Sequence, residues 1–207
     1  MPDEGAVHVI DDDEALRESL AFLLAAANLE VRTYETPKGF LDELEGIASG
    51  CIITDIRMPQ MSGLDLLQRI RQTRADLPVI VITGHGDVPL AVEAMKAGAM
   101  DFLEKPFDDE TLLCAVRAAL RRQGSDDGRE AERRELAQRI SALSGRERQV
   151  LEGLVAGHPN KIIAFDLGIS PRTVEIYRAN LMTKMRAASL SDLVRMALIA
   201  GLLPDRR

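Results

Sequence analysis

Over the first 120 residues, short apolar runs alternate with longer amphipathic segments. Because the runs are short and rich in β-branched residues, they are typical of buried parallel strands. In the segments between them the apolar residues recur at a helical spacing; Leu16, Leu20 and Leu24, for example, share one face. The predicted strands are Ala6–Ile10, Glu30–Tyr34, Cys51–Thr54, Val79–Ile82 and Asp101–Leu103, and further helices are predicted near 37–45, 63–74, 87–97 and 108–122.

This fivefold repeat of strand and helix predicts an α/β domain over residues 4–122. We expect a doubly wound, five-stranded parallel sheet of the flavodoxin-like order 2-1-3-4-5. The next stretch, residues 123–135, is polar and cannot bury a core of its own. We therefore predict a linker over residues 123–138, whose second half is compatible with a solvated helix.

From about residue 139 the apolar spacing is helical throughout. It predicts a second, all-α domain of four helices over residues 139–204, with two of them joined by a glycine-containing turn as in a helix-turn-helix. A capping box at Ser144 and Glu147 starts the first helix, and Gly157 ends it. Asn160 caps the second helix, which ends at Gly168. Ser170-Pro171 starts the third helix, and the fourth covers residues 190–201.

Composition is that of an ordinary globular protein, with 46% hydrophobic and 29% charged residues. No apolar run approaches the roughly 20 residues that span a bilayer, and the acidic N-terminus differs from a secretory signal. These features favour a cytoplasmic protein. Cys51 and Cys114 are too few and too far apart for a disulfide framework, so we expect both to be buried as small apolar residues.

The net charge of −7 is unevenly distributed. Residues 1–123 contain 22 acidic and 12 basic residues, whereas residues 124–207 contain 11 acidic and 14 basic residues. This asymmetry indicates an acidic module joined to one that tolerates a polyanion.

Three carboxylates are predicted to meet at one edge of the sheet. Asp11 and Asp12 follow the first strand and Asp55 ends the third. In the expected order these strands are neighbours, so their carboxyl ends meet at the topological switch point. Crowded carboxylates need a cation, and a hard divalent ion such as Mg²⁺ suits oxygen ligands.

Two further side chains are predicted at the same edge. They are Thr83 at the end of the fourth strand and Lys105 after the fifth. A hydroxyl, an ammonium group and a metal around one carboxylate are the elements of a phosphoryl-transfer site. Asp13 has a simpler interpretation, because an acid at this position usually caps the following helix.

Four motifs in this half resemble the response-regulator receiver: Val-Ile-Asp11-Asp12-Asp13, Thr-Asp55-Ile-Arg57-Met-Pro59, Ile-Thr83-Gly84 and Glu-Lys105-Pro106-Phe107. The resemblance implies that Asp55 accepts a phosphoryl group from a sensor histidine kinase. It also implies that Asp11, Asp12, Asp55 and the Arg57 carbonyl hold Mg²⁺, and that Thr83 and Lys105 bind phosphoryl oxygens. Phe102 would be the aromatic residue that turns inward on activation, and Lys105-Pro106 a cis peptide.

In the second domain, Val174, Tyr177 and Leu181 are predicted to face the core. The opposite face of that helix and the residues near its start then supply candidate contacts to DNA. The candidates are Lys161, Ser170, Arg172, Thr173, Glu175, Ile176, Arg178, Ala179 and Lys184.

The segments Arg146-Glu147-Arg148, Asn160-Lys161-Ile-Ile-Ala164 and Ser170-Pro-Arg172-Thr173-Val174 resemble the LuxR/NarL-type DNA-binding domain. Within that family, the second domain and residues 83–95 are most similar to regulators of rhizobial nitrogen-fixation and microaerobic genes. The resemblance implies a transcriptional activator that acts with RNA polymerase and an oxygen-sensing haem kinase. Because Glu175 and Asp166 stand where bases are frequent, we expect one copy to bind DNA weakly and a dimer to be required.

Phosphorylation is expected to draw Thr83 and Phe102 inward and to create a dimerisation face that includes Val88, Val92, Met95 and Lys96. Two other interpretations stay open. One is a Mg²⁺ phosphatase, but such enzymes typically place an acid where this chain has Arg57. The other is a receiver whose helical tail binds a protein rather than DNA.

Overall fold

The computed structural model describes residues 5–84, 88–121 and 126–202. Two compact units are present, one of residues 1–86 and 97–124 and the other of residues 87–96 and 125–207. In the described part of the chain, none of the helices combines the length and apolar character that crossing a bilayer requires.

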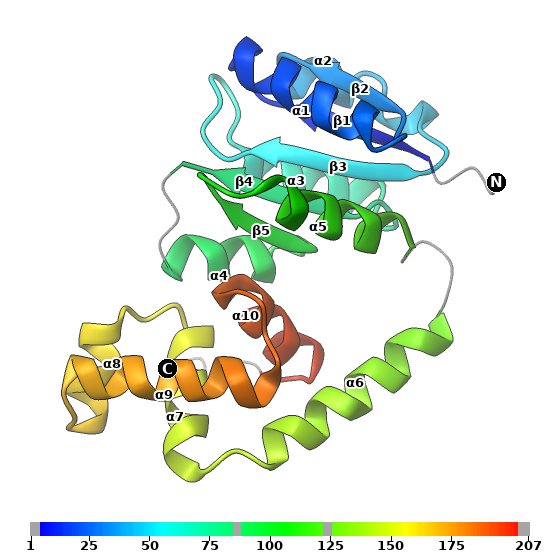
Figure 1. Ribbon diagram of the computed structural model, residues 1–207. Coiled ribbons are helices and arrows are strands. Elements are labelled where there is room, and N and C mark those ends of the chain that lie inside the picture. The colour runs from blue at the N-terminus through cyan, green and yellow to red at the C-terminus, as the bar shows by residue number, and fades with distance from the viewer. Residues whose placement is uncertain (1–4, 85–87, 122–125, 203–207) are drawn as a thin grey trace. The chain divides into compact units, whose positions relative to one another are not determined.

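A five-stranded, fully parallel sheet forms the centre of the first unit (Figure 1). Its order β2-β1-β3-β4-β5 confirms the predicted fold class. The strands are β1 (Ala6–Ile10), β2 (Val31–Tyr34), β3 (Gly50–Asp55), β4 (Val79–Thr83) and β5 (Asp101–Glu104). Every residue of β1, β3 and β4 is buried, as expected for inner strands covered on both faces.

Helices α1 (Glu14–Ala26) and α5 (Asp109–Arg121) share one apolar core on one face of this sheet. On the other face lie α2 (Pro37–Leu41) and α3 (Gly63–Thr73) (Figure 1). The helix predicted over 37–45 is broken: α2 is followed by a short 3₁₀ turn, η1 (Leu44–Gly46). Helix α4 (Val88–Lys96) connects β4 to β5 in sequence.

Local signals account for several helix starts. The Asp13 carboxylate caps α1 by accepting from the Leu16 amide, and Ser62 and Asp65 form a reciprocal capping box at α3.

Cys51 is buried as predicted, but the prediction for Cys114 is wrong, because this thiol is exposed. The buried stripe of α5 runs through Leu112, Ala115, Val116, Ala119 and Leu120, and Cys114 lies between its members.

The second unit contains a helical core. Its helices include α6 (Asp126–Ser141), α7 (Gly145–Val155), α8 (Asn160–Leu167), α9 (Pro171–Met185) and α10 (Leu190–Ile199). The capping box at Ser144 and Glu147 and the Ser170 cap are present as predicted, whereas the cap of α8 is Pro159 rather than Asn160.

Helix α6 covers much of the predicted linker. Near its end, Leu136 and Ile140 are buried in the same core as the helix-turn-helix. The predicted junctions near residues 122–125 and the ends at residues 4 and 204 lie outside the described residues, so the domain boundaries stay predictions.

Candidate functional site

Parallel pairing places four candidate side chains at one edge of the sheet. Ile10 of β1 pairs with Thr54 of β3, so Asp11 and Asp55, one residue further, follow neighbouring strand positions. Thr83 pairs with Glu104, and the backbone N–H of Lys105 donates to the Thr83 carbonyl at 2.8 Å. The peptide bond between Lys105 and Pro106 is cis.

The ammonium group of Lys105 joins the two carboxylates. Its Nζ lies 2.7 Å from Asp55 Oδ1 and 3.3 Å from Asp11 Oδ2. Both acids are buried, with 6% and 2% of their surface exposed, so this ion pair is poorly screened by water. Burial raises the pKa of Asp11. Burial alone would lower the pKa of Lys105, but its hydrogen bond to Asp55 and the two negative charges raise that pKa overall.

Backbone groups hold the remaining carboxylate oxygens. The Arg57 amide donates to Asp55 Oδ2 at 2.5 Å, and the Asp13 amide donates to Asp11 Oδ1 at 2.9 Å. The Arg17 guanidinium also donates to the Asp11 carbonyl at 2.7 Å. This contact was not predicted from the sequence. Arg17 lies one helical turn after Asp13, the cap of α1, and its side chain reaches back to Asp11.

The donor set fits a hard cation. Asp11 and Asp55 already require a positive partner, and their oxygens are the type that Mg²⁺ prefers. Asp12, predicted to join them, is exposed. Within residues 5–84, 88–121 and 126–202, no three His, Cys, Asp or Glu side chains gather as a metal site. The geometry therefore brings together two of the three predicted carboxylates.

Gly63 lies directly against the backbone of Asp55 and Ile56. Its amide donates to the Ile56 carbonyl at 2.9 Å. A Cβ at this position would lie 2.1 Å from the Asp55 carbonyl oxygen. Only glycine therefore lets the start of α3 pack directly against the backbone of Asp55.

Thr83 and Phe102, the two predicted switch residues, are both buried. Thr83 is fully buried and Phe102 is 5% exposed, so the aromatic ring already points inward. In the predicted dimerisation face, Val92 and Met95 are buried and Lys96 is exposed. The side chain of Val88 lies outside the described residues.

Helices α8 and α9 form the predicted helix-turn-helix. Gly168 ends α8 in the left-handed conformation, with φ of 64°, and Ser170 then caps α9 by accepting from the Thr173 amide. Val174 and Leu181 are fully buried, which fixes the rotation of α9 about its axis. The opposite side of the helix must therefore face outward.

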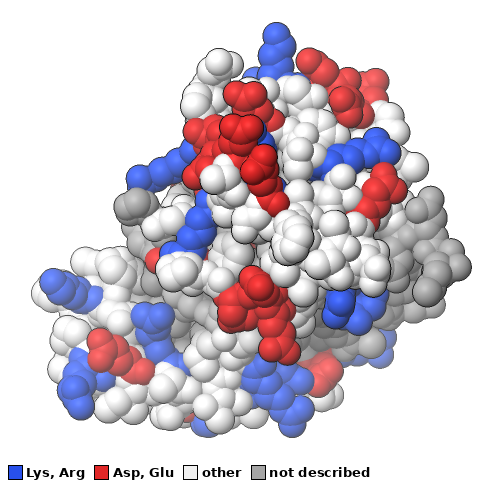
Figure 2. Space-filling view, turned by 45° about the horizontal axis from the view of Figure 1, so that its top comes forward, with Lys and Arg blue, Asp and Glu red and all other residues white. Residues whose placement is uncertain are grey.

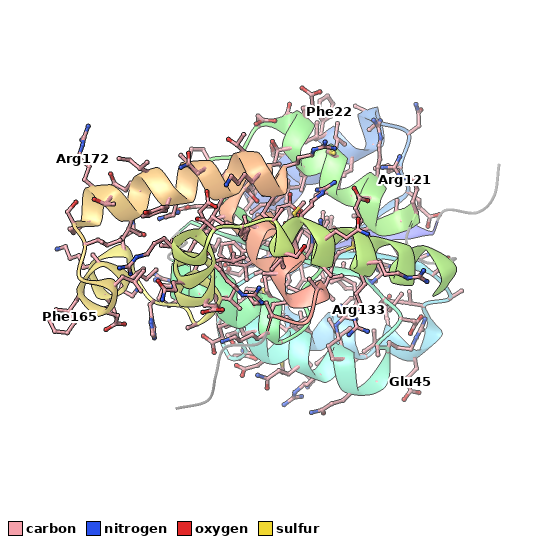
Figure 3. All side chains as sticks on the ribbon, turned by 90° about the horizontal axis from the view of Figure 1, so that it is seen from below. Phe22, Glu45, Arg121, Arg133, Phe165 and Arg172 are labelled. Atoms are coloured by element: carbon pink, nitrogen blue, oxygen red, sulfur yellow. The ribbon has the colours of Figure 1, made fainter. Side chains whose placement is uncertain are left out.

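Most of the predicted DNA contacts lie on that outward side or next to it. Ile176 is 57% exposed, and Arg172 points away from the ribbon (Figure 3). Among the other candidates, Lys161, Ser170, Glu175, Ala179 and Lys184 are exposed, and Thr173 and Arg178 are half-buried. Both signs of charge appear on the visible surface, with the red acidic side chains gathered into patches (Figure 2).

Two of these cations have partners within the helical unit. Lys184 Nζ lies 2.8 Å from Glu147 Oε2, and Arg178 donates to Asn160 Oδ1 at 3.0 Å. The hydrogen bond from Lys184, together with those from Ser144, lowers the pKa of the buried Glu147 to about 2. Lys184 and Arg178 therefore also contribute to the structure of the unit. Arg172 has no hydrogen bond or ion pair with the described side chains, so its substitution tests DNA binding more directly.

Comparison with protein families assigns both parts of the chain. Residues 7–117 match the response regulator receiver domain, and residues 141–197 match the bacterial regulatory proteins of the luxR family. The chain belongs to the response regulators. More closely, it is a two-component response regulator with a LuxR-type DNA-binding domain.

Similar response regulators match over nearly the whole chain. The transcriptional regulatory protein FixJ of Azorhizobium caulinodans is 60% identical over 99% of this chain and 97% of its own length. FixJ of Bradyrhizobium diazoefficiens is 51% identical, over 99% of this chain and 100% of its own length. The crystal structure of full-length FixJ from B. japonicum aligns with a TM-score of 0.57 at 52% identity, covering 96% of this chain and 98% of that one.

Proposed function

We propose that this response regulator accepts a phosphoryl group on Asp55 from a phosphohistidine of a sensor kinase. One Asp55 carboxylate oxygen attacks phosphorus in line. A P–O bond forms as the P–N bond breaks, and the histidine nitrogen keeps the electron pair. The observation that carries this proposal is the pair of buried carboxylates, Asp55 and Asp11, that share the Lys105 ammonium group.

The neighbouring groups have separate roles in that transfer. Lys105 lies close enough to offset negative charge that develops on the phosphoryl oxygens, and Thr83 supplies a hydroxyl at the end of the adjacent strand. Asp11, Asp12, Asp55 and the Arg57 carbonyl would hold Mg²⁺, which supplies further charge neutralisation when bound. The Arg57 amide orients Asp55 through the bond to Oδ2.

We further propose that phosphorylation produces the DNA-binding form. The phosphorylated receiver would form a homodimer through the face that contains Val88, Val92, Met95 and Lys96. The dimer would present two copies of α9 to two half-sites in promoter DNA. Phosphorylation can shift this equilibrium only by stabilising one state more than the other.

Sedimentation tests the dimer. The full chain with Mg²⁺ and acetyl phosphate is expected to sediment as a dimer, and without acetyl phosphate as a monomer. Lys96→Glu, which reverses the charge of the exposed residue of the proposed face, should remain monomeric with unchanged phosphate incorporation. An unchanged mass on full phosphorylation of the wild-type chain would contradict dimer-driven activation.

Gel-shift titrations test the DNA face. Arg172→Ala should weaken binding of the phosphorylated chain to a promoter fragment by about tenfold, because an exposed cation at the start of α9 is lost. Arg69→Ala removes the same charge from an exposed position on α3 and should leave affinity unchanged. Equal affinities of the two variants would favour the alternative in which the helical unit binds a protein.

The similarity to FixJ proteins supports a regulatory target. We propose a transcriptional activator of nitrogen-fixation or microaerobic genes that acts in the cytoplasm with RNA polymerase, downstream of a FixL-like kinase. Mapping the promoters occupied by the chain in cells, with and without oxygen, tests this assignment. We do not propose turnover chemistry, because Arg57 stands where phosphatases that form an aspartyl phosphate place their acid.

A further inference from the structure

His8 is a buried histidine that the phosphoryl chemistry does not use. It lies in the middle of β1 with 1% of its surface exposed. Its ring stacks on Tyr34, with centroids 5.8 Å apart, and meets the edge or face of Phe40 at 5.7 Å. Tyr34 ends β2 and Phe40 belongs to α2, so the histidine connects an inner strand to the two elements outside it.

A chain of two hydrogen bonds leads from this ring towards solvent. His8 Nδ1 lies 3.2 Å from the Tyr34 hydroxyl, and that hydroxyl donates to Glu43 Oε2 at 3.0 Å. A carboxylate can only accept, so the one proton of the hydroxyl points to Glu43. The hydroxyl oxygen must then accept from His8, which requires the proton of the imidazole to be on Nδ1.

The other ring nitrogen has no partner. His8 Nε2 is the one buried side-chain nitrogen or oxygen among the described residues that lacks a hydrogen bond. While Nε2 is unprotonated, its burial costs only the one hydrogen bond that it could accept from water. If His8 took up a proton, Nε2 would become a buried N–H donor without an acceptor and would carry part of a buried charge, which is far more costly.

The surroundings do not compensate that charge. Burial lowers the pKa of His8, and Arg32 on β2 lowers it further, while Glu43 and Glu30 raise it less. Arg32 and Glu30 pair with each other at 3.2 Å. On the inner side, the residue opposite His8 is Ile52 of β3, which is uncharged.

We propose that His8, Tyr34 and Glu43 form an acid-sensitive latch at the outer edge of the receiver sheet. While His8 is neutral the latch holds β2 and α2 in place. When His8 takes up a proton the Nε2–H has no acceptor, and the edge opens to give the imidazolium access to water.

The direction of the pH effect follows from proton linkage. The folded state binds the His8 proton more weakly than the open state, in which His8 titrates near its ordinary value of 6.5. The stabilisation by the latch is therefore complete above that value and decreases as the pH falls below it. One proton taken up on opening raises the opening constant by up to about tenfold per pH unit.

Hydrogen exchange of the full chain between pH 5 and 8 tests the latch. After correction for intrinsic exchange rates, residues 31–44 of the wild-type chain should lose protection below about pH 6.5, and residues 50–55 should lose less. His8→Leu should remove this pH dependence, and His158→Gln, at an exposed histidine, should retain it. The same pH profile in wild-type and His8→Leu would overturn the proposal.

Imidazole nitrogen NMR provides a test that does not depend on the stability of a variant. In the wild-type chain at neutral pH, His8 should carry its proton on Nδ1, and Tyr34→Phe should allow the Nε2-protonated form as well. A wild-type His8 that is protonated on Nε2, or that becomes charged at or above pH 6.5 in the folded chain, would exclude the latch.

Discussion

Asp55→Asn should abolish stable phosphorylation of the chain by acetyl phosphate and by a sensor kinase, and with it the phosphorylation-dependent gain in DNA affinity. The amide oxygen is a poor nucleophile, so no acyl phosphate forms. The fold should be retained, because the one amide oxygen can still accept from the Arg57 N–H or from the Lys105 ammonium group, and only one of the two hydrogen bonds is lost. Phosphate incorporation, measured by mass spectrometry under mild conditions, should fall to background.

Asp42→Asn is the matched control for this result. Asp42 is exposed at the end of α2, so its substitution changes the net charge by the same amount and should leave incorporation at the wild-type level. A phosphate group retained by Asp55→Asn at full stoichiometry would move the acceptor to another residue and would refute the proposed site.

Gly63→Ala should impair the site without touching any of its functional side chains. The added Cβ would lie 2.1 Å from the carbonyl oxygen of Asp55 and 3.1 Å from Ile56 Cα. These are backbone atoms, so no side-chain rotation relieves the overlap, and the acceptor segment must move. Overpacking of this kind costs about 1–3 kcal/mol of stability. A displacement of the acceptor near 1 Å would slow phosphorylation by about 100-fold.

Urea unfolding and the rate of phosphorylation by acetyl phosphate measure the two effects. Gly46→Ala is the control, since a Cβ there meets no atom within 4 Å and Gly46 also lies in the first unit. If folded Gly63→Ala were phosphorylated by acetyl phosphate at the wild-type rate, the prediction would be contradicted. The reaction would then not depend on the position of the Asp55 backbone.

Much of the first unit could be predicted from the sequence because its signals are local. The buried strands are continuous apolar runs, and β1 was predicted with the observed bounds. The convergence of Asp11, Asp55 and Lys105 followed from strand order alone, since parallel strands share one carboxyl edge. The burial of Cys114 was predicted wrongly because the thiol lies beside, not within, the apolar stripe of α5.

The rest depended on distances that no local pattern contains. The overlap of a Gly63 side chain with Asp55 arises from the path of the loop between them. The ion pair of Lys184 with Glu147 joins residues 37 apart, so a candidate DNA contact also connects α9 to α7. The partner of His8 is 26 residues away on a neighbouring strand.

Helix α6 determines where the chain can be divided. Leu136 and Ile140 are buried with the helix-turn-helix, and Arg139 donates to the Met185 carbonyl at the end of α9. A fragment that starts at residue 139 would lack Leu136 and leave a void beneath the last turn of α6. Chimeras that join this DNA-binding domain to another receiver should therefore include α6 from before Glu135. The transferred domain then contains Leu136 and keeps its core complete.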